Sequence, residues 1–224
     1  MCGRYSLATD IEELANRFSF EGGGPSRQAR FNIAPTQEVL TVTQGNSVNH
    51  ARSMKWGLIP SWAKDSSIAN RMINARAETI ETKPMFRQAF ERRRCLVLAD
   101  GFYEWMEMGK IRIPMRVLLK SGEPFAFAGL WETWKSPEGV LVHSCTIITT
   151  TPNVVMEPIH NRMPVILPRK DESLWLDTGQ SKTSALKALL VPYSAAYMEA
   201  YAVSTLVNSP SIDTPDIIAR AARY

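Results

Sequence analysis

Apolar residues recur along this chain with a helical period near its ends and in short runs through its middle. A helix is expected from Thr9 to Phe18, because its apolar residues follow an i, i+3, i+4, i+7 stripe and Thr9 forms a capping box with Glu12. A second helix is expected from Pro84 to Arg94, whose basic end suits the helix dipole. Two shorter helices are expected at Asp171–Asp177 and Lys182–Leu190.

The short apolar runs, separated by Gly, Pro and Ser-Pro turns, predict strands. A hairpin is expected from Glu38 to Trp56 with its turn at 45–47, after a Gly-rich break at 21–25. Further strands are expected at Cys95–Ala99, Phe102–Met106, Ile113–Leu119, Phe125–Leu130, His143–Thr149, Pro164–Leu167 and Met198–Ser204. The expected fold is therefore α+β, a single domain over residues 1–224. Its core would be a curved, barrel-like antiparallel β-sheet flanked by short helices, with a peripheral tail from about residue 209.

Composition narrows the class of protein. The 224 residues are 45% hydrophobic and 21% charged, which is typical of a soluble globular protein. No run approaches the roughly 20 apolar residues that a membrane helix needs, so a cytoplasmic protein is expected, nucleoid-associated in a bacterium or nuclear in a eukaryote. Three widely spaced cysteines argue against a disulfide framework and a zinc site. The net charge of +4 is compatible with nucleic-acid binding.

Cys2 has the most distinctive chemistry in the chain. Its small side chain makes Met1 a good substrate for removal, which leaves an α-amine and a thiol on adjacent carbons. With reference pKa values of about 8 and about 8.5, both groups supply some nucleophilic form near neutral pH. An aldehyde can form an imine with this nitrogen, and the sulfur can then close a thiazolidine ring intramolecularly. The alternative is that a cysteine at this position has no chemical role.

Two polar stretches would suit such a reaction. In Asn74-Ala-Arg-Ala-Glu-Thr79, an extended backbone would place Asn74, Arg76 and Glu78 on one face. In Asp100-Gly-Phe-Tyr-Glu-Trp105, Glu104 lies between two aromatic residues, where desolvation would suit it to proton transfer. A capped loop and a half-exposed strand glutamate are the structural alternatives.

Two further stretches point to a polar site and a stacking surface. His160 lies close to Arg162 at the entry to an expected strand, although a structural histidine is the alternative. Trp56-Gly-Leu-Ile-Pro-Ser-Trp62-Ala-Lys64 resembles a platform for bases, and stacking contributes about 1–3 kcal/mol per base. We expect Trp56 in the core and Trp62 on the surface.

Taken in order, these motifs resemble those of the SRAP family (SOS response-associated peptidases, also called abasic-site processing proteins). The resemblance covers residues 1 to about 208. Its motifs are Met1-Cys-Gly-Arg4, Phe31-Asn-Ile-Ala-Pro35, the tryptophan loop, Asn74-Ala-Arg-Ala-Glu-Thr79, Asp100-Gly-Phe-Tyr-Glu-Trp105, Ile159-His-Asn-Arg-Met-Pro164 and Val203-Ser-Thr-Leu-Val-Asn208.

The resemblance implies a sensor of abasic sites in single-stranded DNA that becomes covalently attached through Cys2 after Met1 is lost by autoproteolysis or to an aminopeptidase. Glu104 is then the expected acid or base and His160 a second proton shuttle. Asn74 is expected to orient the Cys2 amine or a sugar hydroxyl. Weak lyase activity is expected where ring closure is slow, and no metal or cofactor is needed.

Contacts to the DNA follow from the same resemblance. Arg4, Arg76 and Arg162 are expected to hold the flanking phosphates. Asn32 and Pro35 are expected to shape a channel beside Trp62. Because Ser61 and Ala63 flank Trp62 where some relatives carry a second aromatic residue, the stacking surface is expected to be smaller.

Two other functions stay open at this point. One is a thiol peptidase that uses Cys2, Glu104 and His160 to cut other proteins. The other is a non-covalent reader of modified bases that uses only the tryptophan loop and the arginines. The preferred expectation is a monomer that acts on abasic single-stranded DNA at replication forks or at junctions of single and double strands.

Overall fold

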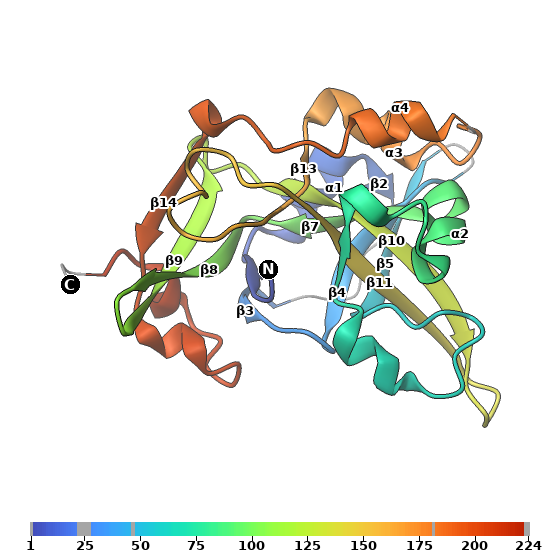
Figure 1. The fold of residues 1–224 in the computed structure, drawn as a ribbon, viewed down its shortest axis with the longest axis horizontal. Coiled ribbons are helices and arrows are strands. Elements are labelled where there is room, and N and C mark those ends of the chain that lie inside the picture. Colours follow the sequence, from blue (N-terminus) through green and yellow to red (C-terminus); the bar gives the residue numbers. More distant parts are fainter. Residues whose placement is uncertain (1, 22–27, 46–47, 181, 222–224) are drawn as a thin grey trace.

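The computed structural model describes residues 2–21, 28–45, 48–180 and 182–221. Within them the chain forms two curved sheets with short helices around them, which confirms the expected α+β fold with a barrel-like core (Figure 1). Three expectations concern residues outside the described part: removal of Met1, most of the Gly-rich break, and the hairpin turn at 46–47.

Five strands close into a barrel. They are β4 (Glu38–Thr43), β5 (Asn49–Trp56), β7 (Arg94–Ala99), β10 (Phe125–Lys135) and β11 (Leu141–Thr150). Antiparallel pairs run from β5 through β4, β7 and β10 to β11, and a short parallel pairing of β11 with β5 completes the ring. Four short strands extend this sheet: β2 (Phe20–Glu21), β6 (Asn74–Arg76), β12 (Met163–Pro164) and β13 (Ile166–Leu167).

The second sheet carries the start of the chain. Its order is β14-β9-β8-β1-β3, and every pairing in it is antiparallel. The strands are β1 (Tyr5–Leu7), β3 (Arg30–Ile33), β8 (Gly101–Met108), β9 (Ile111–Leu119) and β14 (Met198–Ala202). Because β1 lies between β3 and β8, residues 2–4, which lead into β1, lie near the centre of the view in Figure 1.

Among the described residues, four α-helices lie around the barrel: α1 (Ile11–Phe18), α2 (Pro84–Arg92), α3 (Glu172–Leu176) and α4 (Thr183–Ala188). Six 3-10 helices lie between the other elements: η1 (Ser66–Arg71), η2 (Ala77–Thr79), η3 (Arg169–Asp171), η4 (Ala195–Tyr197), η5 (Thr205–Asn208) and η6 (Pro215–Ile218). In the described part of the chain, no helix is long and apolar enough to cross a membrane.

The predicted capping box of the first helix is wrong. Asp10 is the N-cap of α1, and its carboxylate accepts the backbone N–H of Glu12 at 2.8 Å. Thr9 instead donates its hydroxyl to Asp100, a contact between segments far apart in the sequence. The predicted apolar stripe is confirmed, because Leu14 and Phe18 are buried.

Arg94 shows where the second predicted helix was too long. It begins β7, and its side chain is almost fully buried. Its guanidinium donates to the carbonyls of Phe90 and Glu91 at the end of α2, and to those of Trp175 and Asp177. The basic end therefore does satisfy helix carbonyls, but it does so from the next strand.

The chain after residue 209, expected to be peripheral, makes buried contacts. Ile217 is fully buried, and Asp213 accepts the backbone N–H groups of Phe31 and Asn32. A bridge between Val203 and Arg220 adds a backbone connection.

Candidate active site around Cys2

The sheet pairing brings Cys2 beside Glu104. Tyr5 pairs with Phe102, and the Tyr103 N–H donates to the Arg4 carbonyl at 2.9 Å, so the chain before Tyr5 continues along β8 toward Glu104. Cys2 is 0% exposed and Glu104 is 3% exposed. The two residues are thus placed in one buried region although 102 positions separate them in the sequence (104 − 2).

Several groups surround Cys2. The Asn74 amide donates to the Cys2 carbonyl at 2.9 Å, and the Arg4 backbone N–H donates to the Cys2 sulfur. Burial raises the pKa of the Cys2 thiol strongly, the charge of Glu104 raises it further, and the Arg4 N–H opposes both. The sulfur is therefore held as a protonated thiol beside a carboxylate.

Asn74 reaches Cys2 because β6 is added to the barrel. Asn74 pairs with Ile147 and Arg76 with Thr149 in a parallel register on β11. The extended backbone covers Asn74–Arg76 only, because Ala77–Thr79 form the 3-10 helix η2, so the expected single face does not extend to Glu78. Ala75 is buried and Arg76 is exposed. The side of β6 that carries Asn74 is thus the side that meets the start of the chain.

His160 lies in the loop that returns from β11 to β12. The ring nitrogen Nδ1 of His160 accepts the backbone N–H of Arg162 at 3.0 Å. The backbone N–H of His160 donates to the Met156 carbonyl at 2.8 Å. The residue lines a cavity of about 390 Å³ together with Trp105, which follows Glu104 on β8. The loop therefore brings the imidazole to the strand that carries Glu104.

The three arginines differ in their partners. Arg162 donates to both carboxylate oxygens of Glu78, at 2.6 and 3.0 Å, and to the Thr149 carbonyl at 2.6 Å. The hydrogen bond from Arg162 is the main reason why the pKa of Glu78 is lowered. Arg76 is exposed on the same segment. Arg4 is half-buried and donates to Asn32 and to the Val207 carbonyl.

Asn32 does not fit its expected place in a DNA channel. It is 0% exposed, and its amide donates to the carbonyls of Val207, Ser209 and Ile212. A side chain enclosed in this way holds protein backbone, so we correct its assignment to a structural one.

The tryptophan loop divides as the sequence predicts. Trp56 is fully buried, with its indole N–H donating to the Ile73 carbonyl at 2.9 Å, whereas Trp62 is 62% exposed. The Trp134 indole donates to the Ala63 carbonyl at 2.7 Å and so supports the loop next to Trp62. Pro35 is half-buried in a turn after β3. Trp62 is thus an exposed aromatic surface on a supported loop.

Comparison with known proteins identifies the family. A family model described as SOS response associated peptidase (SRAP) matches residues 1–210. This chain belongs to the SRAP family. Over 221 residues, it is 47% identical to the abasic site processing protein YoqW of Bacillus subtilis, covering 97% of this chain and 99% of that protein.

More distant relatives also match this chain in sequence and in fold. The chain is 33% identical over 199 residues to the abasic site processing protein HMCES of Rattus norvegicus, covering 75% of this chain and 56% of that protein. A solved structure of a protein from Bacteroides thetaiotaomicron matches with a TM-score of 0.89 and 28% identity, over 99% of this chain and 100% of that one. Another, from Bordetella bronchiseptica, matches with a TM-score of 0.78 and 25% identity, over 91% and 100%.

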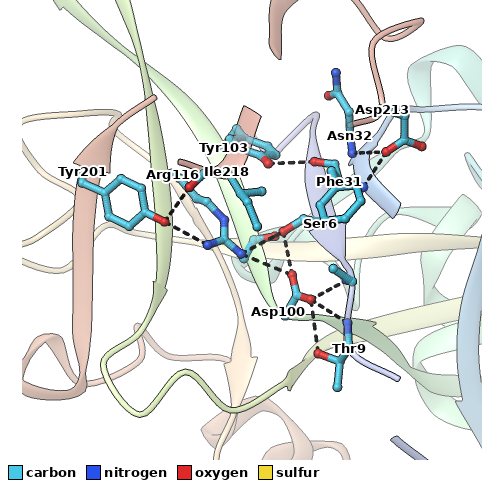
Figure 2. Close-up of polar contacts among 12 residues, drawn as sticks. Ser6, Thr9, Phe31, Asn32, Asp100, Tyr103, Arg116, Tyr201, Asp213 and Ile218 are labelled. Carbon is cyan, nitrogen blue, oxygen red and sulfur yellow. Dashed lines mark hydrogen bonds and ion pairs between the residues drawn. The ribbon is translucent and has the colours of Figure 1, made fainter. Parts of the chain in front are cut away.

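A buried network of charged and polar side chains holds β1, the strand that follows Cys2. Asp100 accepts the Ser6 hydroxyl at 2.6 Å and the Thr9 N–H at 3.0 Å, and it pairs with Arg116 at 3.4 Å (Figure 2). Arg116 also donates to the Tyr201 hydroxyl, which in turn donates to the carbonyl of Ile218. The network joins β1, the turn between β7 and β8, β9 and β14, so it fixes the strand that leads to Cys2.

Several site residues were not singled out from the sequence. The Trp105 indole donates to Asn208 at 2.7 Å, and the Arg4 guanidinium lies 6.0 Å from the Trp105 ring. The Val203–Asn208 motif marked Asn208 in the sequence, but nothing in the motif indicated that Asn208 would contact Trp105. Asp213 could not be identified from the sequence, because it lies beyond the region that matches the family and its type and neighbours are typical of a turn.

No group of three or more His, Cys, Asp or Glu residues suited to a metal ion occurs among the described residues.

Proposed function

We propose that this SRAP protein processes abasic sites in single-stranded DNA by forming a covalent thiazolidine through Cys2. The observation that carries the proposal is the placement of Cys2, whose carbonyl is held by Asn74 and whose thiol lies next to the charge of Glu104. Its relatives from Bacillus subtilis and Rattus norvegicus are named abasic site processing proteins.

The reaction requires that Met1 be removed first, because the Cys2 nitrogen is otherwise part of a peptide bond. We include autoproteolytic removal of Met1 in the proposal. The freed amine then attacks C1′ of the open-chain sugar, and water leaves to give an imine. The Cys2 sulfur adds to the same carbon while a proton reaches the nitrogen, which closes the thiazolidine without any oxidation or reduction.

The groups around Cys2 suit the proton transfers that this reaction needs. Because burial and the charge of Glu104 keep the thiol protonated, a base must accept its proton as sulfur attacks, and we assign that role to the Glu104 carboxylate. His160 serves as the second proton shuttle, at ring opening of the sugar and at loss of water. Where ring closure is slow, the imine permits β-elimination at the 3′ phosphate, which gives weak lyase activity.

The raised pKa of the Cys2 thiol favours this reaction over cleavage of other proteins. A thiol peptidase attacks with a thiolate, which burial and the charge of Glu104 disfavour here, whereas thiazolidine formation starts at the Cys2 amine and uses the sulfur only after the imine has formed. A non-covalent reader has no need of a cysteine in such surroundings. The function as a thiol peptidase or as a reader is therefore the second choice.

The binding surface is proposed to combine Trp62, Arg76 and Arg162. Trp62 offers an exposed ring for stacking, and the two arginines lie on segments joined to β11. We propose that the protein acts as a monomer in the cytoplasm, nucleoid or nucleus, on lesions at replication forks or at junctions of single and double strands.

Intact-mass measurement tests the proposal directly. Processed protein incubated with an abasic single-stranded oligonucleotide should gain the mass of the oligonucleotide less one water, and the adduct should survive denaturant. Cys2→Ala should abolish the adduct, and so should an N-terminal tag that cannot be removed. A Cys2→Ala protein that forms the adduct as fast as wild type would overturn the proposal. Turnover of a peptide, or a shift that detergent removes, would support its rivals.

A further inference from the structure

A short C-terminal segment is bound to the start of the chain. We call residues 204–213 the C-terminal latch. Asn32 is its main anchor, because its Nδ2 donates to the carbonyls of Val207 at 3.3 Å, Ser209 at 2.9 Å and Ile212 at 2.7 Å. Its Oδ1 accepts from Arg4 Nη1 at 2.8 Å. Both ends of this one amide are thus engaged, one with the latch and the other with Arg4.

Arg4 connects the latch to Cys2. Its Nη1 also donates to the Val207 carbonyl at 2.7 Å, its backbone carbonyl accepts the Tyr103 N–H, and its backbone N–H donates to the Cys2 sulfur. The residue two positions from Cys2 is therefore held by the latch, by β8 and by the thiol itself.

Asp213 holds the other side of the latch. One carboxylate oxygen accepts the N–H groups of Phe31 and Asn32, the latter at 2.9 Å (Figure 2). The other oxygen pairs with Arg30 at 2.5 Å. From the middle of the latch, the Asn208 side-chain oxygen accepts the Trp105 indole N–H at 2.7 Å. The latch therefore joins β3 to β8, the two strands that flank β1.

We propose that the C-terminal latch positions Cys2 for reaction, with Asn32 and Asp213 as its positioning residues. Attack on C1′ requires the nitrogen and the sulfur of one residue in a defined orientation, and such geometry has a large effect on rate. The latch determines the orientation of the Cys2–Arg4 segment without contributing a reacting group. This inference rests on the proposed function.

DNA binding should be separable from this role. Trp62, Arg76 and Arg162 come from the tryptophan loop, β6 and the loop before β12, and no hydrogen bond named for them reaches the latch. Arg4, also expected to hold a phosphate, is left out of the proposed binding surface because its guanidinium donates to Asn32 and to the Val207 carbonyl. Loss of the latch should therefore lower the rate of cross-linking at saturating DNA and leave the DNA concentration for half-maximal rate unchanged.

The test uses full-length Asn32→Ala protein with abasic single-stranded DNA under single-turnover conditions. The maximal rate constant should fall at least about tenfold, while the half-saturating DNA concentration stays within about twofold of wild type. Amide hydrogen exchange should increase over residues 2–7 and 101–104, which is a reading independent of DNA. Asn49→Ala is the matched control, because that amide donates to the Phe18 carbonyl at 3.0 Å in another part of the fold.

Asp213→Ala is the second variant, since Asp213 is partly exposed and its loss should leave the fold intact. It should repeat the fall in rate, and Asp213→Asn should restore part of it because one oxygen can still accept the two N–H groups. An unchanged rate in both variants, or an equal rise in the half-saturating concentration, would overturn the inference. If wild type itself formed no adduct, the proposed function would fail, while the exchange measurement would still report on the latch.

Discussion

At the scale of single residues, Arg162 already has a carboxylate partner in the folded protein. Glu78 accepts two hydrogen bonds from its guanidinium, and the Thr149 carbonyl accepts a third. The Glu78 side chain is 46% exposed, so the pair contributes little to stability, at most about 1 kcal/mol. Its consequence is for the proposed DNA-binding surface, where a phosphate would compete with Glu78 for Arg162.

Glu78→Gln should therefore strengthen binding to undamaged single-stranded DNA by about two- to fivefold, and the slope of log affinity against log salt should steepen by about 0.7. Fluorescence anisotropy over a salt series measures both quantities. The pKa of Glu78 is lowered, so the carboxylate stays charged below the ordinary glutamate range. The difference between variant and wild type should persist there and disappear once Glu78 is protonated.

Glu81→Gln is the control for this prediction. It removes the same charge three residues away, where the partner is Lys187 of α4 at 2.6 Å. If both variants gained affinity equally, overall charge would explain the result. A weaker affinity of Glu78→Gln would show that Glu78 orients Arg162 for the phosphate.

At the scale of elements, the turn after β3 contains a strained residue. Thr36 has φ of 72°, in the left-handed region that a β-branched residue rarely occupies. Hydrogen bonds on either side hold it: the Thr36 N–H donates to the Trp56 carbonyl at 2.8 Å, and the Gln37 side chain accepts the Ala34 N–H at 3.0 Å. The turn is thus fixed by the first barrel hairpin rather than by its own preference.

Thr36→Gly should stabilise the protein by about 0.5–1 kcal/mol, because glycine adopts this conformation without strain but adds entropy to the unfolded chain. The midpoint and slope of urea unfolding measure the change. Thr36→Ala should recover less, because a Cβ at positive φ remains. A destabilised glycine variant would mean that the threonine side chain supports the turn.

At the scale of the whole molecule, closure of the barrel depends on a close approach at Gly129. A Cβ at this position would lie 2.8 Å from Cys95 Sγ and 2.8 Å from Val97 Cγ2. The strand β10 pairs there with β7 on one side and β11 on the other, so neither neighbour can move freely. The glycine lets five strands curve around a filled interior.

Gly129→Ala should destabilise the protein by about 1–3 kcal/mol, as overpacking of a core does. Thermal and urea unfolding measure the loss. In a double-mutant cycle, Cys95→Ala should reduce the cost of Gly129→Ala, because it removes one of the two opposing atoms. Additive effects would show that the clash is relieved elsewhere.

The elements were predictable from sequence because they depend on local pattern. Apolar runs gave β7 nearly to the residue, and the helical stripe gave the buried face of α1. Strands β10 and β11 were predicted short, because beyond Leu130 and before His143 the hairpin leaves the core and alternates with polar residues. The expected cap, Thr9, was wrong because its hydroxyl donates to Asp100, and Asp10 caps α1 in its place.

By itself, the sequence determined the chemistry available to this protein. A cysteine after Met1, an exposed Trp62, and the motifs that carry Asn74, Glu104 and His160 are properties of residue type and order. Tertiary structure alone decided which of these groups meet, because pairing between distant strands places Glu104 and Asn74 beside Cys2. It also decided that Asn32 and Arg4 hold the C-terminal latch. Periodicity reports the face on which a side chain lies, but not the segment that packs against that face.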